Sequence, residues 1–413
     1  MHGPPADAEL ARLVRDEAGR LVAGLARAIG DLDVAEEAVQ EAIVEALEAW
    51  RRDGPPPNPG GWLTTAARRN AVDRLRRMAL HRTKVAALAR LAEAVEPAAG
   101  GRVAGVPDER GPDERLPLLF ACCHPALPVA ARIALTLRAV VGLTTAEIAR
   151  ALITSEATAA QRIVRAKRKI VQAGIALRVP SEDLVGRLDT VLTVVYLAFN
   201  EGYLTSSGDR AARRDLASDA RWLAALVATE LPGEPEALGL LALLTLLGAR
   251  EPARFAADGG LVLLADQDRS RWDAAAIAEG TRLLERAAGR RRPGRFQLQA
   301  AIAAVHAEAG TWADTDWPQI LALYELLRRH DGSPVVRLNQ AVALAHVCGP
   351  APALAEVDGL GDALRDYHLF HATRAELLHM LARPDEARDA GRRALALTGN
   401  PAERALIRAR LAR

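Results

Sequence analysis

The densest group of side chains able to do chemistry lies in TSEATAAQRIVRAKRK, residues 154–169. On a helix, Arg162 and Arg165 can each donate two hydrogen bonds to a guanine, and Gln161 can do the same to an adenine. Three further cations end the stretch, where they suit backbone phosphates: Lys167, Arg168 and Lys169. These residue types predict contact with nucleic acid.

Two short helices and a turn of three or four residues would position these side chains. Thr144 or Thr145 can cap the first helix, and Thr154 or Ser155 can cap the second. Such a pair holds its second helix out from the domain, where it fits the major groove of DNA. Because many helical proteins carry an amphipathic helix with a basic end, a solvated surface is the alternative interpretation of this motif alone.

A second basic stretch, GGWLTTAARRNAVDRLRRM at residues 60–78, favours the nucleic-acid interpretation. Helical spacing places four apolar residues on one side: Trp62, Ala66, Val72 and Leu75. The other side is basic and partly polar, and carries Arg68, Arg69, Arg76 and Arg77. These arginines too have the alternative of a solvated face.

An acidic helix precedes it in DLDVAEEAVQEAIVEALEAW, residues 31–50. Asp33 is a candidate N-cap with Glu36 three residues on. Four apolar residues face inward: Val39, Ile43, Leu47 and Trp50. Four glutamates form an acidic stripe: Glu37, Glu41, Glu45 and Glu48. DNA would repel this stripe, so we expect it to meet a basic protein surface or water.

Composition bounds the fold and the compartment. The chain has 413 residues, half of them hydrophobic, and its apolar residues recur three and four apart, so we expect an all-α protein. Three cysteines are too few for a disulfide framework and lack paired zinc-ligand spacing, which fits a reducing cytoplasm. We expect no membrane association, because the longest apolar run, residues 238–249, is too short to cross a bilayer and fits a buried helix.

Breaks in the helical pattern divide the chain. GPPPNPGG at residues 54–61 is expected to exclude helix, and GGRVAGVPDERGPDER at 100–115 has the composition of a linker. Two similar stops, DGSP and TGNP, end 67 residues apart at Pro334 and Pro401, about two tetratricopeptide periods. The predicted parts are 1–79, the linker 80–115, 116–178, a helical domain 179–290, and tetratricopeptide-like repeats 291–413.

The order of these motifs resembles a known family. An acidic AEEAVQEA helix, a WL...ARRNAVDRLRR helix, a linker and GLTTAEIARALITSEATAAQRIVRAKRKI resemble regions 2 and 4 of bacterial extracytoplasmic-function RNA polymerase sigma factors, over about residues 8–178. The resemblance implies a helical bundle for region 2, a helix-turn-helix domain for region 4, and core RNA polymerase and promoter DNA as partners. The turn of the helix pair carries Ile153 where glycine is common in the family.

The resemblance also assigns side chains to three surfaces. Core polymerase would meet Glu37, Gln40 and Glu41. The loop 54–61 and the helix that follows would open and read the −10 promoter element with Arg68, Arg69, Asn70, Asp73, Arg76 and Arg77. The −35 element would meet Ser155, Thr158, Gln161, Arg162, Arg165 and Lys169.

The remainder resembles a subgroup of these sigma factors that has a long helical carboxy-terminal extension. ACCHPAL at 121–127, YLAFNEGY at 196–203 and LLADQDRSRWD at 263–273 are among the stretches that suggest it. The resemblance implies a regulatory role for the extension and a possible protein partner.

We expect no catalytic residue, metal site or cofactor. The adjacent Cys122 and Cys123 suggest burial, with an oxidant sensor as the alternative. Asn200, Glu201 and Tyr203 read as the turn that ends a helix. The main alternative to a sigma factor is a helix-turn-helix regulator that does not engage polymerase and binds a ligand or protein through its repeats.

Overall fold

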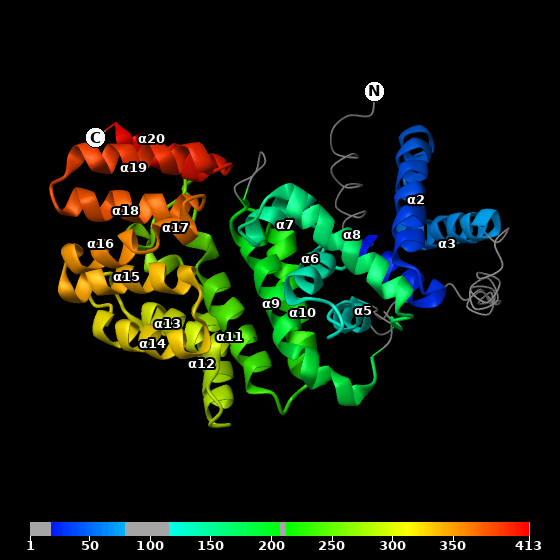
Figure 1. The fold of residues 1–413 in the computed structure, drawn as a ribbon, viewed down its shortest axis with the longest axis horizontal. Helices are drawn as coiled ribbons and strands as arrows, with labels where there is room; N and C mark the ends of the chain where they lie inside the picture. Colours follow the sequence, from blue (N-terminus) through cyan, green and yellow to red (C-terminus); the bar gives the residue numbers. More distant parts are fainter. Residues whose placement is uncertain (1–17, 79–114, 178, 207–211, 413) are drawn as a thin grey trace. The chain divides into compact units, whose positions relative to one another are not determined.

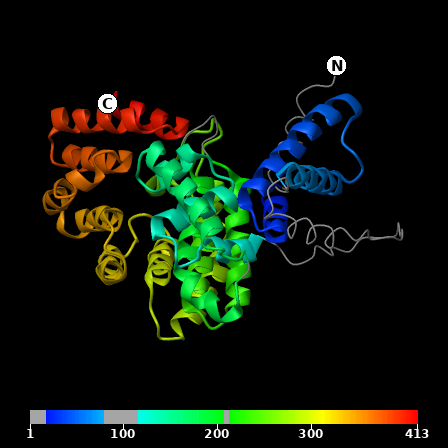
Figure 2. The same ribbon diagram turned by 45° about the vertical axis from the view of Figure 1, so that its right-hand side comes forward.

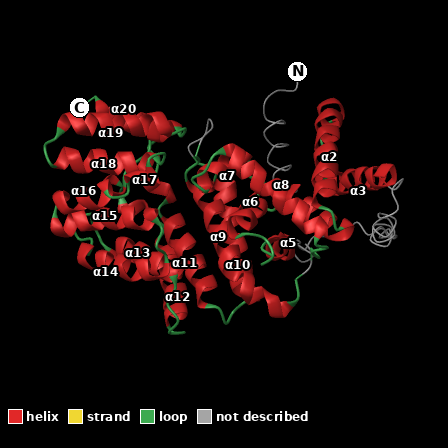
Figure 3. Ribbon diagram, viewed as in Figure 1, coloured by secondary structure: helices red, strands yellow, loops and turns green. Residues whose placement is uncertain are grey.

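The structure, a computed structural model, describes residues 18–78, 115–177, 179–206 and 212–412. Within those ranges every regular element is an α-helix or a short 3-10 helix, and the β-structure is one isolated bridge between Phe255 and Leu261. Figure 3 shows this helical content. The all-α prediction is confirmed. The predicted linker 80–115 lies outside the described residues, apart from Arg115.

The chain forms two compact units, Met1–Val194 and Val195–Arg413. Their boundary falls inside α9 (Leu184–Tyr203). These units are coarser than the five predicted parts, whose boundaries stay predictions.

The acidic and basic stretches of the first unit form α2 (Leu32–Asp53) and α3 (Pro59–Met78), which pack against each other. Ala46, Trp50 and Leu63 form a buried cluster between them. The Trp50 and Trp62 rings meet edge to face with centroids 5.6 Å apart, and Ile43 and Leu47 pack against the cluster as the helical spacing predicted.

The predicted cap of α2 is wrong. Asp31, not Asp33, is the N-cap, and its carboxylate accepts the backbone N–H groups of Asp33 and Val34 at 3.1 and 3.2 Å. Because an aspartate stands at both positions, the sequence pattern fits either start.

The predicted extent of the non-helical stretch is also wrong. Helix α3 starts at Pro59, inside the 54–61 stretch, so the loop ends at Asn58. A proline suits the first turn of a helix, where its missing N–H has no intrahelical partner to lose. The Asn58 side chain accepts the Gly61 N–H at 2.9 Å and holds this start.

Four helices complete the described part of region 116–178: α5 (Arg115–Cys122), α6 (Val129–Ala139), α7 (Thr145–Ala151) and α8 (Glu156–Gln172). Helix α6 packs against α5, α7 and α8. Ile148 and Ala149 of α7 are buried, which fixes the helix pair to this small core.

The second unit begins around a buried helix. The apolar run 238–249 lies in α11 (Pro235–Ala249), which is buried along most of its length, as predicted. Helix α11 contacts three other helices of this part: α10 (Arg214–Glu230), α12 (Ala274–Ala288) and α13 (Arg295–Glu308). Figure 1 shows α11 among these helices, in green and yellow.

Consecutive helices fill the rest of the second unit, which Figures 1 and 2 show in yellow to red. They are α14 (Trp317–His330), α15 (Pro334–Cys348), α16 (Pro350–Asp358), α17 (Gly361–Leu364), α18 (His368–Met380), α19 (Pro384–Leu397) and α20 (Pro401–Leu411). Neighbours in sequence pack on each other, as in α14 with α15 and α18 with α19. The helix pairs fit the tetratricopeptide-like reading, which stays a prediction.

Candidate nucleic-acid interface

A capped turn positions α8, the second helix of the predicted pair. Thr144 caps α7 in a capping box: the Glu147 N–H donates to its hydroxyl at 3.2 Å, and its own N–H donates to the Glu147 carboxylate at 2.7 Å. Ser155 caps α8 and accepts the Thr158 N–H at 3.2 Å. Of the two candidates for each cap, the structure selects Thr144 and Ser155.

Ile153 in this turn adopts the left-handed backbone conformation, with φ at 48°. A β-branched residue is rarely found there, because its side chain crowds the backbone. Neighbouring hydrogen bonds hold the turn: the Ile153 N–H donates to the Arg150 carbonyl at 3.1 Å, and the Thr154 N–H donates to the Ala149 carbonyl at 2.8 Å.

One side of α8 is buried, and the other carries free cations. The buried residues are Ala159, Ile163, Ala166 and Ile170. Gln161 is exposed, and among the described residues no acid pairs with Arg162, Arg165, Arg168 or Lys169. Unpaired cations on an outward helix face are available to phosphates and base edges.

Ser155 and Thr158, both predicted at the −35 surface, lie at the amino-terminal end of α8. Their hydroxyls are 2.8 Å apart, and Ser155 also forms the cap. A helix amino terminus carries partial positive charge, so this end also suits a phosphate. The structure therefore brings all six predicted −35 residues onto one helix and its cap.

Lys167 is the exception among the cations of α8. Its ammonium lies 2.7 Å from a carboxylate oxygen of Asp33 and 3.0 Å from a carboxylate oxygen of Glu36. Both acids belong to the start of α2. Burial lowers the pKa of Lys167, but the hydrogen bond to Asp33 and the charge of Glu36 outweigh this, and the net pKa is raised. Lys167 thus binds region 116–178 to α2, whereas the sequence suggested a role at the DNA backbone.

The basic side of α3 is only partly free. Arg68 and Arg77 are exposed, and Arg76 lies 3.6 Å from the Asp73 carboxylate. Arg69 is exposed but pairs with Glu45. Asn70 is buried, and its side-chain amide donates to the same Glu45 at 3.0 Å. Of the predicted −10 residues, Arg69 and Asn70 therefore both contact Glu45 of α2, and Asn70 is the buried one of the two.

The acidic stripe meets a basic partner inside its own unit. Arg74 of α3 pairs with both Glu37 and Glu41, which are about half exposed, and Gln40 between them is exposed. Sequence reasoning missed Arg74, because its partners lie 33 and 37 residues away. The available signal was its place four residues after Asn70, on the side of α3 that faces α2.

The two adjacent cysteines are buried, as predicted. Burial raises the pKa of both thiols, that of Cys123 to about 12, so neither is a thiolate at neutral pH. The described ranges contain no cluster of three histidines, cysteines or acids placed to hold a metal. Among those residues there is also no helix with the length and apolar character needed to traverse a bilayer.

Comparisons with known proteins agree with this geometry. Residues 13–80 match "Sigma-70 region 2", residues 118–170 match "Sigma-70, region 4", and residues 187–288 match a "Family of unknown function (DUF6596)". A protein of Rhizobium meliloti (strain 1021), described as "Uncharacterized protein R00370", is 43% identical over 388 residues, which cover 94% of this chain and 91% of the relative. No solved structure matches the chain significantly.

The matched regions contain every residue predicted to touch polymerase or DNA. Helices α2 and α3 lie in region 2, and α8 ends close to the end of the region 4 match. The sequence match and the free cations of α8 point to the same activity. The chain therefore belongs to the sigma-70 family: it is an RNA polymerase sigma factor, with core polymerase and promoter DNA as partners and a long carboxy-terminal extension.

Proposed function

We propose that this sigma factor is of the extracytoplasmic-function type and acts in the cytoplasm through regions 2 and 4. Members of that type rely on these two domains. In this chain the region 2 match ends at residue 80 and the region 4 match begins at residue 118, so a short segment separates the two. As a sigma factor, the protein is a specificity subunit and not a catalyst. The observation that carries the promoter reading is the row of unpaired cations on α8.

In this proposal the two helices have different tasks. Helix α8 enters the major groove at the −35 element, where Gln161 and Arg165 reach base edges. Helix α3 tracks the strand opened at the −10 element, where the exposed side chains of Arg68 and Arg77 can meet its phosphates. The face of α2 around Gln40 meets core polymerase.

Paired substitutions on α8 test the −35 assignment. Arg165→Ala should weaken binding of the polymerase complex to its preferred promoter by about 1–3 kcal/mol and relax the sequence preference at one base pair. Arg168→Ala is the matched control, because it also removes one cation of α8. It should weaken binding to all promoters alike and reduce the salt dependence of binding by about one charge. Equal effects of both variants on every promoter base would refute base reading by Arg165.

We further propose that the extension regulates the sigma regions. The alignment with the relative from Rhizobium meliloti covers 94% of this chain at 43% identity, so it includes the extension together with regions 2 and 4. The first part of the extension, residues 187–288, matches a distinct family. An extension kept over this length fits a working part of the protein better than a passive tail.

The cut that tests this proposal follows Val194, the last residue of the first unit. A shorter chain ending at residue 178 would lose Arg187, which is buried and donates to the Phe120 carbonyl at 3.1 Å. Transcription by the full chain and by residues 1–194 should differ in strength or promoter choice. Equal start sites and equal yields would leave the extension without a regulatory role.

A further inference from the structure

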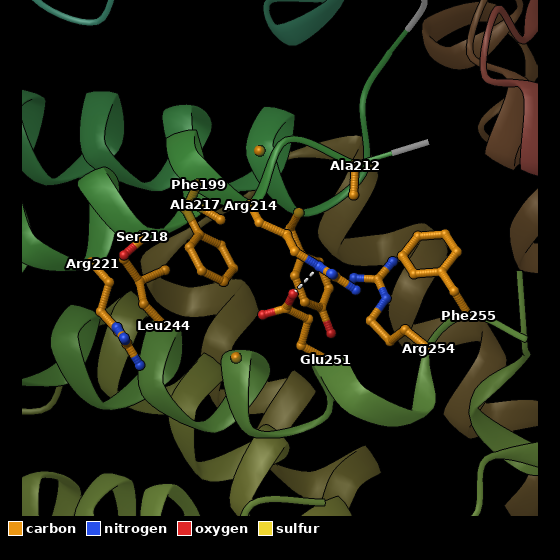
Figure 4. Close-up of a pocket in the computed structure, with 13 residues that line it drawn as sticks. Phe199, Ala212, Arg214, Ala217, Ser218, Arg221, Leu244, Glu251, Arg254 and Phe255 are labelled. Atoms are coloured by element: carbon orange, nitrogen blue, oxygen red, sulfur yellow. Dashed lines mark ion pairs between the residues drawn. The ribbon is translucent and has the colours of Figure 1, made fainter. Parts of the chain in front are cut away.

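A cavity of about 240 Å³ lies in the second unit, within the region that matches the family of unknown function. Its walls come from the end of α9, the start of α10, the end of α11 and the 3-10 helix η2 (Glu251–Ala253) with the residues after it. Figure 4 shows its lining side chains. Its size suits a ligand of one or two rings.

The cavity is positively charged. Three arginines and a single acid line it: Arg214, Arg221, Arg254 and Glu251. Glu251 pairs with Arg214, as the dashed line in Figure 4 marks. Arg221 and Arg254 have no acid partner among the described residues, so two positive charges remain unbalanced. Such a lining favours an anion.

Arg254 gives the strongest indication of a ligand. Its side chain is buried, with only 7% of the residue exposed, and its Nη1 group has no hydrogen-bond partner among the described residues. Its guanidinium carbon lies 3.4 Å from the centroid of the Tyr203 ring. Burial lowers the pKa of this arginine, which reflects the cost of the charge in that place. A buried donor without an acceptor is rare, and a bound anion would supply one.

Flat apolar surfaces stand beside this charge. The Phe199 and Tyr203 rings are stacked with centroids 5.2 Å apart, and Phe255 and Leu244 also line the cavity. In Figure 4 the guanidinium groups of Arg214 and Arg254 point toward one another, with Phe255 beside Arg254. A ligand that matched both kinds of wall would combine a negative group with a planar apolar body.

We propose that this cavity binds a small aromatic carboxylate. Its carboxylate accepts hydrogen bonds from Arg254, and its ring lies against the apolar lining formed by Phe199 and Leu244. The proposal concerns a binding site in the extension, so it stands independently of any regulatory role for that part of the chain.

Gly248 offers a way to close the cavity without breaking the fold. It lines the cavity in α11, and a Cβ built on it would meet no atom within 4 Å. A leucine there also raises the helix propensity of the position. Gly248→Leu should therefore fill the space that the ligand needs.

Titration of the purified full chain with 2-naphthoate, followed by calorimetry, tests the site. The carboxylate should bind, and the neutral 2-naphthamide should bind at least tenfold more weakly. Arg254→Met and Gly248→Leu should each weaken 2-naphthoate binding at least tenfold. Arg282→Met, which removes an exposed arginine of α12 paired with Glu279, should leave it unchanged. No binding of 2-naphthoate, or equal binding of the amide, overturns the proposal.

Thermal unfolding separates loss of the site from loss of the fold. Without ligand, Arg254→Met should melt at the same temperature as the parent chain or higher, because it removes a buried donor that has no acceptor. If the Arg254→Met chain does not fold, 2-naphthoate binding by the Gly248→Leu chain tests the site. Unchanged 2-naphthoate affinity in a folded Gly248→Leu chain contradicts binding in this cavity.

Discussion

Ile153 shows how a single residue records a departure from the family pattern. Its φ of 48° is easy for glycine and costly for a β-branched side chain. We expect Ile153→Gly to raise the free energy of unfolding of the helix pair by about 0.5–1 kcal/mol, because relief of strain exceeds the added chain entropy. Hydrogen exchange of the α7 and α8 amides in the full chain measures this. Faster exchange would mean that the Ile153 side chain stabilises the turn by its contacts.

His306 is the residue whose titration should be visible in stability. It lies in α13 with its ring centroid 5.4 Å from that of Trp317, and its Nδ1 is buried without a partner among the described residues. Burial, followed by the charges of Arg250 and Arg269, lowers its pKa to about 4. An unfolded chain, with an ordinary histidine pKa, therefore takes up a proton between pH 6.5 and 4 that the folded chain does not.

The free energy of unfolding should fall as the pH falls through this window, by about 2 kcal/mol from His306 between pH 7 and pH 5. Urea unfolding at the two pH values measures the loss, and His306→Gln should reduce it. His330→Gln, which removes an exposed histidine, should not. If both variants lose the same stability as the parent chain, His306 does not remain neutral in the folded protein.

At the scale of the element, α2 and α3 share a layer of ion pairs that complicates any test of polymerase binding. Charge reversal of Glu37 and Glu41 changes the surface around Gln40 but also breaks both pairs with Arg74. We expect the double variant Glu37→Lys with Glu41→Lys to weaken core polymerase binding at least tenfold. Arg74→Gln breaks the same ion pairs and keeps the two acids. Its affinity for core polymerase should therefore lie within about threefold of that of the parent chain. Equal losses in the two variants would place the effect in helix packing.

Helix α8 has its own contact with α2 through Lys167. Glu36 is buried apart from 15% of its side chain, so removing Lys167 leaves a carboxylate with little water and no cationic partner among the described residues. We expect Lys167→Met to lower the free energy of unfolding by about 1–3 kcal/mol, less than for a fully buried pair because Asp33 is exposed. Arg168→Met on the same helix is the control and should change it by less than about 0.5 kcal/mol. A similar small effect of Lys167→Met would show that this contact does not stabilise the fold.

Local sequence patterns predicted the helices and their buried faces better than the ion pairs between helices. Helical spacing correctly buried Val39 and Trp50, because core-facing positions follow from the period alone. The ion pairs of Arg74 and Lys167 were missed, since they join residues more than 30 positions apart. The start of α3 at Pro59 was missed because proline excludes helix interiors but not first turns.

At the scale of the whole molecule, the cavity near Arg254 illustrates the same limit. Its charged residues are separated by up to 40 positions, and in the sequence Tyr203 reads simply as the end of a helix. Only the packing of α9, α10 and α11 brings them to one place. Regions 2 and 4 were predictable because each motif is short and local, whereas a cavity in an all-helical extension has no local signature.

The central claim is that this protein directs RNA polymerase to promoters through regions 2 and 4. The most direct measurement is mapping of transcription start sites on a library of promoter fragments, with purified core polymerase alone and with the full chain added. The account predicts new start sites that share a −10 and a −35 sequence and that disappear in the Glu37→Lys, Glu41→Lys variant. No new start site with either the full chain or residues 1–194, together with no stable core complex, would contradict it.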